Sequence, residues 1–138
     1  MKNQTSVKEL LVNQGFRVTQ ARAAVLDFLV KTQKPVDVVA IEAYLAKNMI
    51  DADQVTIYRM LEAFVEKNII ERLDFHEGKF RYELIKGEHH HLICESCGTI
   101  TDISDCPIEN IEQSILKNQK FLVKRHALEF FGYCRQCQ

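Results

Sequence analysis

The sequence predicts an α+β fold in which an N-terminal winged helix-turn-helix domain is followed by a small α/β domain with a structural zinc site. The first observation is a series of helical patterns followed by two strand patterns, all within residues 1–84. The second is a pair of CxxC motifs in the rest of the chain. With 138 residues, 46% of them hydrophobic, the chain can bury one core or two small ones.

Four helices are predicted from apolar residues at helical spacing and from capping residues. Thr19, Asp37 and Asp53 are favourable N-caps, and Asn68 suits a left-handed helix end. The helix after Asp53 has a continuous apolar stripe and keeps polar residues on its outer face. The predicted ranges are 7–13, 20–31, 38–47 and 54–67.

Two strands, 69–75 and 79–84, are predicted to form a hairpin across the turn His76-Glu77-Gly78. In the second strand Phe80, Tyr82 and Leu84 alternate with charged residues, as in a half-buried strand. Helices followed by such a hairpin indicate a winged helix-turn-helix. Helix 54–67 then takes the position of the recognition helix.

The second half is predicted to contain mostly strands. Residues 85–88 read as a hinge between a domain of residues 1–84 and a domain of residues 89–138. After the hinge we expect strands at 89–94 and 99–103, a helix at 108–117 that starts beside Pro107, and a last strand at 121–131.

Composition excludes several classes of protein. No stretch reaches the eighteen apolar residues of a membrane span, and the N-terminus lacks the apolar run of a signal peptide. We therefore expect a cytoplasmic protein without membrane partners. The net charge of −1 shows no overall excess of basic residues of the kind that attracts nucleic acid. If the protein binds DNA, local basic patches and dimerisation would have to supply the affinity.

The two CxxC motifs, Cys94/Cys97 and Cys134/Cys137, are the strongest chemical signal. Four thiolates can hold one tetrahedral Zn²⁺ in a closed structural site. The segment 98–133 between them exceeds the roughly 15–20 residues of a zinc ribbon, so the metal would join distant parts of one domain. The alternatives are a redox pair or unligated buried cysteines, and Cys106 stands alone.

Three consecutive histidines open the predicted strand 89–94. Side chains alternate along a strand, so His89 and His91 face one way and His90 the other. One metal could not readily take all three. Mixed histidine and carboxylate ligation suits Zn²⁺, Fe²⁺ or Mn²⁺ without selecting sharply among them. The alternative is a solvated histidine cluster at a domain junction.

The assembled motifs resemble the ferric uptake regulator superfamily of metal-responsive repressors. The matching segments, in chain order, are GFRVTQAR, DQVTIYRMLEAFVEKNIIERLDF, GKFRYEL, EHHHLICESCGTITD and RHALEFFGYCRQC. The resemblance covers nearly the whole chain. It implies a homodimer that binds a double-stranded operator, an AT-rich palindrome, and represses genes of metal homeostasis in response to iron or zinc.

The resemblance also implies ligands for a regulatory metal near the hinge. Its hinge site maps onto Glu83, His89 and His91, and Asp102 matches an acidic position used by some members. A further histidine usually comes from the segment before the third helix, which here contains Lys34-Pro35-Val36. His76 or Glu71 could supply the missing ligand.

A second site of the resembled family lies within the dimerisation domain. It maps onto His90, Glu109 and His126, with Glu88 at a further ligand position. The cofactors implied are therefore structural Zn²⁺ and a second divalent metal, Fe²⁺, Zn²⁺ or Mn²⁺.

For DNA, the resemblance points to the recognition helix and to the start of the second helix. Arg59 offers bidentate contacts to guanine or phosphate, and Tyr58 can touch a thymine methyl group. Arg17 matches a residue that enters the minor groove, and Arg22 is a candidate phosphate contact. The predicted DNA-binding residues are Arg17, Arg22, Thr56, Tyr58 and Arg59.

Other functions fit the sequence less well. A peroxide-sensing regulator of the same superfamily would typically have an aspartate in place of Glu83. A zinc-stabilised interaction module would leave the winged-helix half unexplained. A metal-dependent hydrolase would need a general base beside the metal, and no HExxH motif supplies one. We therefore expect no enzymatic activity.

Overall fold

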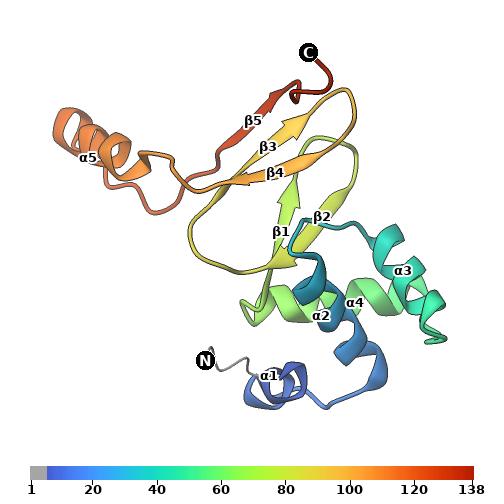
Figure 1. Ribbon diagram of the computed structural model, residues 1–138. Helices are drawn as coiled ribbons and strands as arrows, with labels where there is room; N and C mark the ends of the chain where they lie inside the picture. Colours follow the sequence, from blue (N-terminus) through green and yellow to red (C-terminus); the bar gives the residue numbers. More distant parts are fainter. Residues whose placement is uncertain (1–5) are drawn as a thin grey trace. The chain divides into compact units, whose positions relative to one another are not determined.

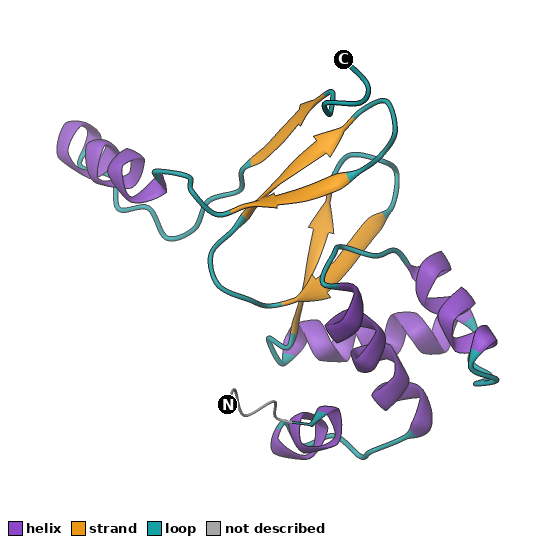
Figure 2. Cartoon of the chain, in the orientation of Figure 1, coloured by secondary structure: helices purple, strands orange, loops and turns teal. Residues whose placement is uncertain are grey.

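The computed structural model describes residues 6–138 and divides the chain into two compact units. The first ends at Ile85 and the second spans Lys86–Gln138. The first unit is mostly helical and the second is built on a sheet (Figure 2). The chain therefore has the α+β fold that its sequence predicts.

The helices of the first unit begin at the predicted caps. The side chains of Thr19, Asp37 and Asp53 each accept a hydrogen bond from the backbone N–H three residues later, at 3.2, 2.8 and 2.7 Å. These bonds satisfy donors that a helix cannot pair within itself. The helices are α1 (Val7–Asn13), α2 (Gln20–Thr32), α3 (Val38–Lys47) and α4 (Gln54–Glu66).

One apolar core holds these helices together, and α4 contributes its central residues. Ile57, Leu61 and Phe64 are fully buried, and the Phe64 ring meets the ring of Phe16 edge to face, with centroids 5.3 Å apart. Burying side chains of this size is the main favourable term in folding. Since the apolar stripe faces inward, the opposite face of α4 is left exposed.

The hairpin after α4 pairs β1 (Ile70–Asp74) with β2 (Phe80–Leu84) in antiparallel register. Its turn contains two residues with left-handed backbone, His76 at φ 60° and Gly78 at φ 80°. Asn68, where α4 ends, is also left-handed, as predicted. Tyr82 bridges to Val36, so β2 is tied to the segment between α2 and α3.

The second unit contains a three-stranded sheet with the order β4-β3-β5. The strands are β3 (His90–Cys94), β4 (Ile100–Ile103) and β5 (Glu129–Gly132). β3 lies in the middle (Figure 1), antiparallel to β4 and parallel to β5. The candidate ligands of this unit lie on these strands or in the segments that adjoin them, except Glu109, which lies on the helix that follows β4.

The predicted last strand, 121–131, is wrong for most of its length. β5 starts only at Glu129, and the preceding segment, with Phe121 and Leu122 63% and 61% exposed, is not a strand. A strand needs a partner, and β5 pairs with the short stretch from His91 to Cys94 of β3. Within the described residues 6–138, the apolar residues before Glu129 therefore have no strand to pair with.

The remaining helix, α5 (Ile108–Gln119), follows β4 and is two residues longer than predicted. Pro107 occupies the position just before the helix and gives it no side-chain cap. Within residues 6–138, none of the helices combines the length and the apolar content that a membrane crossing requires.

We predict that Phe64→Ala lowers the free energy of unfolding by about 3–5 kcal/mol, because it removes a fully buried ring and leaves a cavity. Urea denaturation followed by circular dichroism measures the loss. The control is Val39→Ala, at a position 66% exposed, which should change stability by less than about 0.5 kcal/mol. Equal denaturation midpoints for the two variants would contradict the assignment of α4 to the core.

Candidate metal centres and nucleic-acid interface

The four cysteines of the CxxC motifs lie together at one end of the sheet. β3 and β5 run parallel with Cys94 opposite Gly132, so the turn after β5 reaches the turn after β3. The four Sγ atoms all lie within 4.8 Å of one another, and those of Cys97 and Cys134 are 3.7 Å apart. Two thiolates on one tetrahedral Zn²⁺ are roughly 3.8 Å apart, given bonds of about 2.3 Å. The cluster therefore fits a closed structural zinc site.

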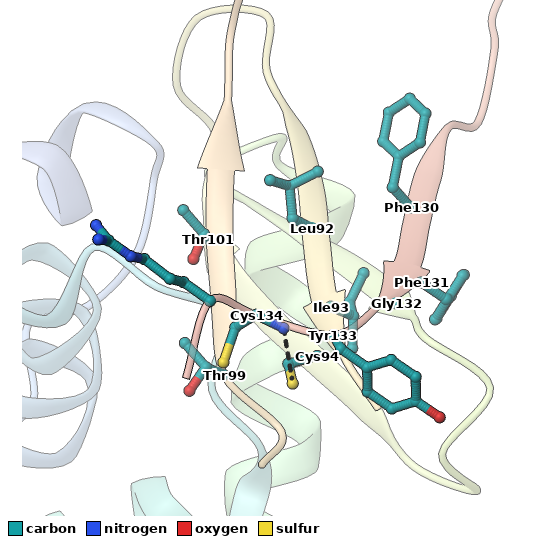
Figure 3. A pocket seen from close by; sticks show the side chains of 11 residues that line it. Leu92, Ile93, Cys94, Thr99, Thr101, Phe130, Phe131, Gly132, Tyr133 and Cys134 are labelled. Carbon is teal, nitrogen blue, oxygen red and sulfur yellow. Dashed lines mark hydrogen bonds between the residues drawn. The ribbon is translucent and has the colours of Figure 1, made fainter. Parts of the chain in front are cut away.

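Hydrogen bonds favour the thiolate form of two members of this cluster, Cys94 and Cys97. The backbone N–H of Cys134 donates to Sγ of Cys94 at 3.3 Å (Figure 3) and, together with other backbone donors, lowers the pKa of Cys94 to about 6. A hydrogen bond with the Thr99 hydroxyl group lowers the pKa of Cys97. Because the thiolate is the metal ligand, these contacts prepare the site for a cation.

A first group of histidines and carboxylate lies on one face of β3. His91 pairs with Asp102 of β4, with Nε2 and Oδ1 3.7 Å apart, and the rings of His89 and His91 have centroids 4.8 Å apart. The ligand atoms of His89, His91 and Asp102 lie within 4.8 Å of one another. The ammonium group of Lys86 forms an ion pair with the other oxygen of Asp102.

The ring of His89 is held in one tautomer. Its Nδ1 lies 2.8 Å from the carbonyl oxygen of Gly87, which can only accept, so Nδ1 carries the proton. The lone pair is then on Nε2, the atom a metal would need. Glu83, the remaining member predicted for this group, belongs to β2 of the first unit.

A second group lies on the other face of β3. Nε2 of His90 is 2.8 Å from Nε2 of His126, and Nε2 of His126 is 3.7 Å from an oxygen of Glu88. Burial and the neighbouring His126 lower the pKa of His90. Within residues 6–138, the buried Nδ1 atom of His90 has no hydrogen-bond partner. The 2.8 Å contact has the length of an N–H···N hydrogen bond. Two nitrogens on one tetrahedral ion would be roughly 3.3 Å apart, so the two rings would have to separate by about 0.5 Å to share a cation.

The carboxylate beside His126 is Glu112, which the sequence analysis did not identify. Its Oε1 lies 3.0 Å from Nδ1 of His126. For Glu109, the structure shows no hydrogen bond or ion pair within the part of the chain that it describes. Glu112 follows Glu109 by three residues and so lies on the same helix face. That spacing is the signal that could have identified it.

The residues predicted to contact DNA are distributed over two elements of the first unit. Thr56, Tyr58 and Arg59 lie on the exposed face of α4, where Tyr58 is 46% exposed. Arg17 is exposed in the segment before α2. The guanidinium group of Arg22 donates to the carbonyl oxygen of Arg17 at 2.9 Å, so Arg22 also supports this segment.

The sheet of the second unit also carries an apolar pocket beside the cysteine cluster (Figure 3). It is lined by residues of all three strands and of the turn after β5, among them Leu92, Phe130 and Tyr133. These three side chains are 38%, 44% and 62% exposed. The only metal-binding side chains in the lining are Cys94 and Cys134, which already belong to the cysteine cluster. The pocket therefore offers apolar contact area rather than a reaction site.

Comparisons with known proteins agree on one family. The model of the ferric uptake regulator family matches residues 13–131. A ferric uptake regulation protein of Bordetella parapertussis is 35% identical over 93% of this chain and 94% of its own length. A peroxide operon regulator of Bacillus subtilis is 30% identical over 94% of this chain and 89% of its own length.

A solved structure of a member of the same family also resembles this chain. The ferric uptake regulator of Francisella tularensis with iron superposes with a TM-score of 0.80, at 29% sequence identity. The match covers 89% of this chain and 95% of that one.

We predict that Cys97→Ser lowers the zinc content and destabilises the second unit, because three thiolates hold the ion less tightly than four. Metal analysis and thermal unfolding of the purified protein measure both effects. The matched control is Cys106→Ser, since Cys106 lies outside the cluster. Loss of zinc from Cys106→Ser, with full zinc in Cys97→Ser, would contradict the assignment.

Proposed function

Because the chain belongs to the ferric uptake regulator family, we propose that it is a metal-dependent, DNA-binding repressor of metal homeostasis genes. The observation that carries the proposal is the combination of two features in one chain. A winged helix-turn-helix precedes the hinge, and the strand after the hinge has metal-binding side chains on both faces. A metal bound there could influence how DNA is held. The proposal places the protein in the cytoplasm, where its operator is.

The DNA contact would be made by α4 and by the segment before α2. A helix-turn-helix inserts its second helix into the major groove. Exposure of Thr56, Tyr58 and Arg59 on α4 supports this role, as does the exposed Arg17. Arg59 would bind guanine or phosphate, and Tyr58 a thymine methyl group. Arg22 would contact phosphate or hold Arg17 in place.

The DNA-binding form would be a homodimer on an AT-rich palindrome. The second unit supports this, because Leu92, Phe130 and Phe131 are 38–44% exposed on its sheet and Tyr133 is 62% exposed next to it. An exposed apolar surface of this kind marks a protein interface. Two-fold symmetry of the protein would match the symmetry of the operator.

The regulatory metal would bind near the hinge, to Glu83, His89, His91 and Asp102. The geometry of His89, His91 and Asp102 in the second unit supports this set. The usual fourth contributor, a histidine before α3, is absent from Lys34-Pro35-Val36. For regulation, the metal has to bind the DNA-competent conformation more tightly than the conformation that does not bind DNA. Bound DNA then raises the affinity for the metal by the same factor by which the metal raises the affinity for DNA.

A second site would lie on the opposite face, with His90 and His126 as nitrogen donors and Glu88 and Glu109 as carboxylates. The approach of the two Nε2 atoms to 2.8 Å supports it. Fe²⁺, Zn²⁺ and Mn²⁺ all suit such donors. The cysteine cluster would keep Zn²⁺ permanently, because four thiolates bind it far more tightly.

A peroxide-sensing regulator is the second candidate. The relative from Bacillus subtilis named a peroxide operon regulator favours it. In the peroxide-sensing subgroup, hinge histidines are oxidised through bound Fe²⁺, and the hinge site typically has an aspartate. Glu83 at that position favours the iron- or zinc-responsive reading.

We predict that a labelled AT-rich palindromic duplex binds about 5- to 150-fold more tightly when Fe²⁺, Mn²⁺ or Zn²⁺ is present. Fluorescence anisotropy, with and without a chelator that leaves the cysteine-bound zinc in place, measures the difference. A duplex of scrambled sequence is the control. Equal affinity with and without metal would contradict metal dependence. Absence of any DNA binding would favour an interaction module.

Because the hinge set lacks its usual histidine, we predict that the second site controls DNA binding. His90→Ala or His126→Ala should abolish the metal-dependent gain in anisotropy, and His89→Ala should only weaken it. The same titrations measure all three variants at matched zinc content. A larger loss in His89→Ala would show that the hinge set is the controlling site.

A further inference from the structure

The contact between Glu112 and His126 determines which ring nitrogen of His126 can bind a metal. Oε1 of Glu112 lies 3.0 Å from Nδ1 of His126. A carboxylate can only accept a hydrogen bond, so the proton of this contact is on Nδ1. In the neutral ring the lone pair is therefore on Nε2.

Nε2 of His126 is also the atom that faces the second site. It lies 2.8 Å from Nε2 of His90 and 3.7 Å from the carboxylate of Glu88. Glu112 binds the other nitrogen, so it sits behind the ring with respect to these donors. From that position Glu112 orients the ring without needing to bind the metal itself.

We propose that Glu112 is a positioning residue of the second metal site, which holds His126 in the Nδ1–H tautomer and aims Nε2 at the ion. Metal-binding histidines commonly donate their other N–H to a carboxylate, which fixes the ring and makes it more basic. The inference rests on the proposed function for the existence of the site. It adds a residue that the family resemblance did not indicate.

The position of Glu112 on α5 supports this role over that of a general surface charge. Its side chain is 35% exposed and that of His126 29%, so water screens the contact only in part. The buried residue of α5 is Ile108, one turn before Glu112. The carboxylate therefore reaches His126 from a helix that is anchored close by.

The first measurement is the tautomer of His126 in the full chain with zinc on the cysteines and no other metal. Long-range ¹H–¹⁵N correlation spectra of histidine-labelled protein distinguish the Nδ1–H from the Nε2–H form. We expect the Nδ1–H form in the wild type and a shift toward Nε2–H in Glu112→Ala. In Glu112→Gln the amide oxygen can still accept, so the wild-type tautomer should be retained.

The second measurement is Zn²⁺ affinity, by competition with a chromophoric chelator. A His89→Ala/His91→Ala background leaves one histidine site for the added Zn²⁺. We expect Glu112→Ala to weaken binding about 10- to 100-fold, the usual effect of losing such a partner. Glu112→Gln should recover part of the loss, since it restores the hydrogen bond without the charge.

The matched control is Asp105→Ala, which removes another exposed carboxylate just before α5 and should leave both measurements unchanged. Zinc content of the cysteine site and circular dichroism check that each variant is folded. A Glu112→Ala protein with the wild-type tautomer and Zn²⁺ affinity within twofold of wild type would overturn the inference. So would a tautomer shift in Glu109→Ala but not in Glu112→Ala.

Neither measurement uses DNA, so the role of Glu112 and the proposed repressor function are tested independently of each other. If Glu112→Ala behaves like the wild type while metal still controls DNA binding, only the role of Glu112 is wrong. If the tautomer and the affinity change as expected but DNA binding never depends on metal, the proposed repressor function is wrong and the role of Glu112 stands.

Discussion

The position of β3 at the centre of its sheet is the constraint on which both groups of histidines and the cysteine cluster depend. A central strand is paired on both sides, so its register is fixed twice, by β4 and by β5. Its side chains alternate between faces. On this short strand His91 therefore lies beside Asp102 and His90 beside His126. The strand ends at Cys94, which lies beside Cys134. A slip of one residue would exchange the two faces and separate every one of these pairs.

Local chemistry accounts for the parts of the fold that were predictable. Thr19, Asp37 and Asp53 mark helix starts because each supplies an acceptor to its own first turn. The limits of β5 were not predictable in this way. They depend on where the parallel strand β3 begins and ends, which is tertiary information, and the apolar run before Glu129 gave a misleading strand pattern.

In the candidate site, too, some features follow from the local sequence and others depend on tertiary structure. The opposite orientation of His90 relative to its neighbours follows from strand geometry alone, and the CxxC spacing indicates the thiolate cluster. The partner of His126 does not follow, because Glu109 and Glu112 lie on the same face of α5 and only the rotation of that helix decides between them. Roles in DNA binding depend on a partner that the chain itself does not contain, and they are supported by exposed positions on α4 and before α2.

The parallel pairing of β3 with β5 also has a consequence for how the protein is made. Synthesis runs from the N-terminus, and domains generally fold as units in that order. The winged-helix unit has all of its core residues once Tyr82 and Leu84 have emerged from the ribosome. The thiolate cluster needs residues 134–137 as well, so Cys94 and Cys97 emerge about forty residues before their partners. During that interval the nascent chain carries a folded winged-helix unit and two thiols without their partners, so the four-cysteine cluster can hold zinc only after residue 137 has been added.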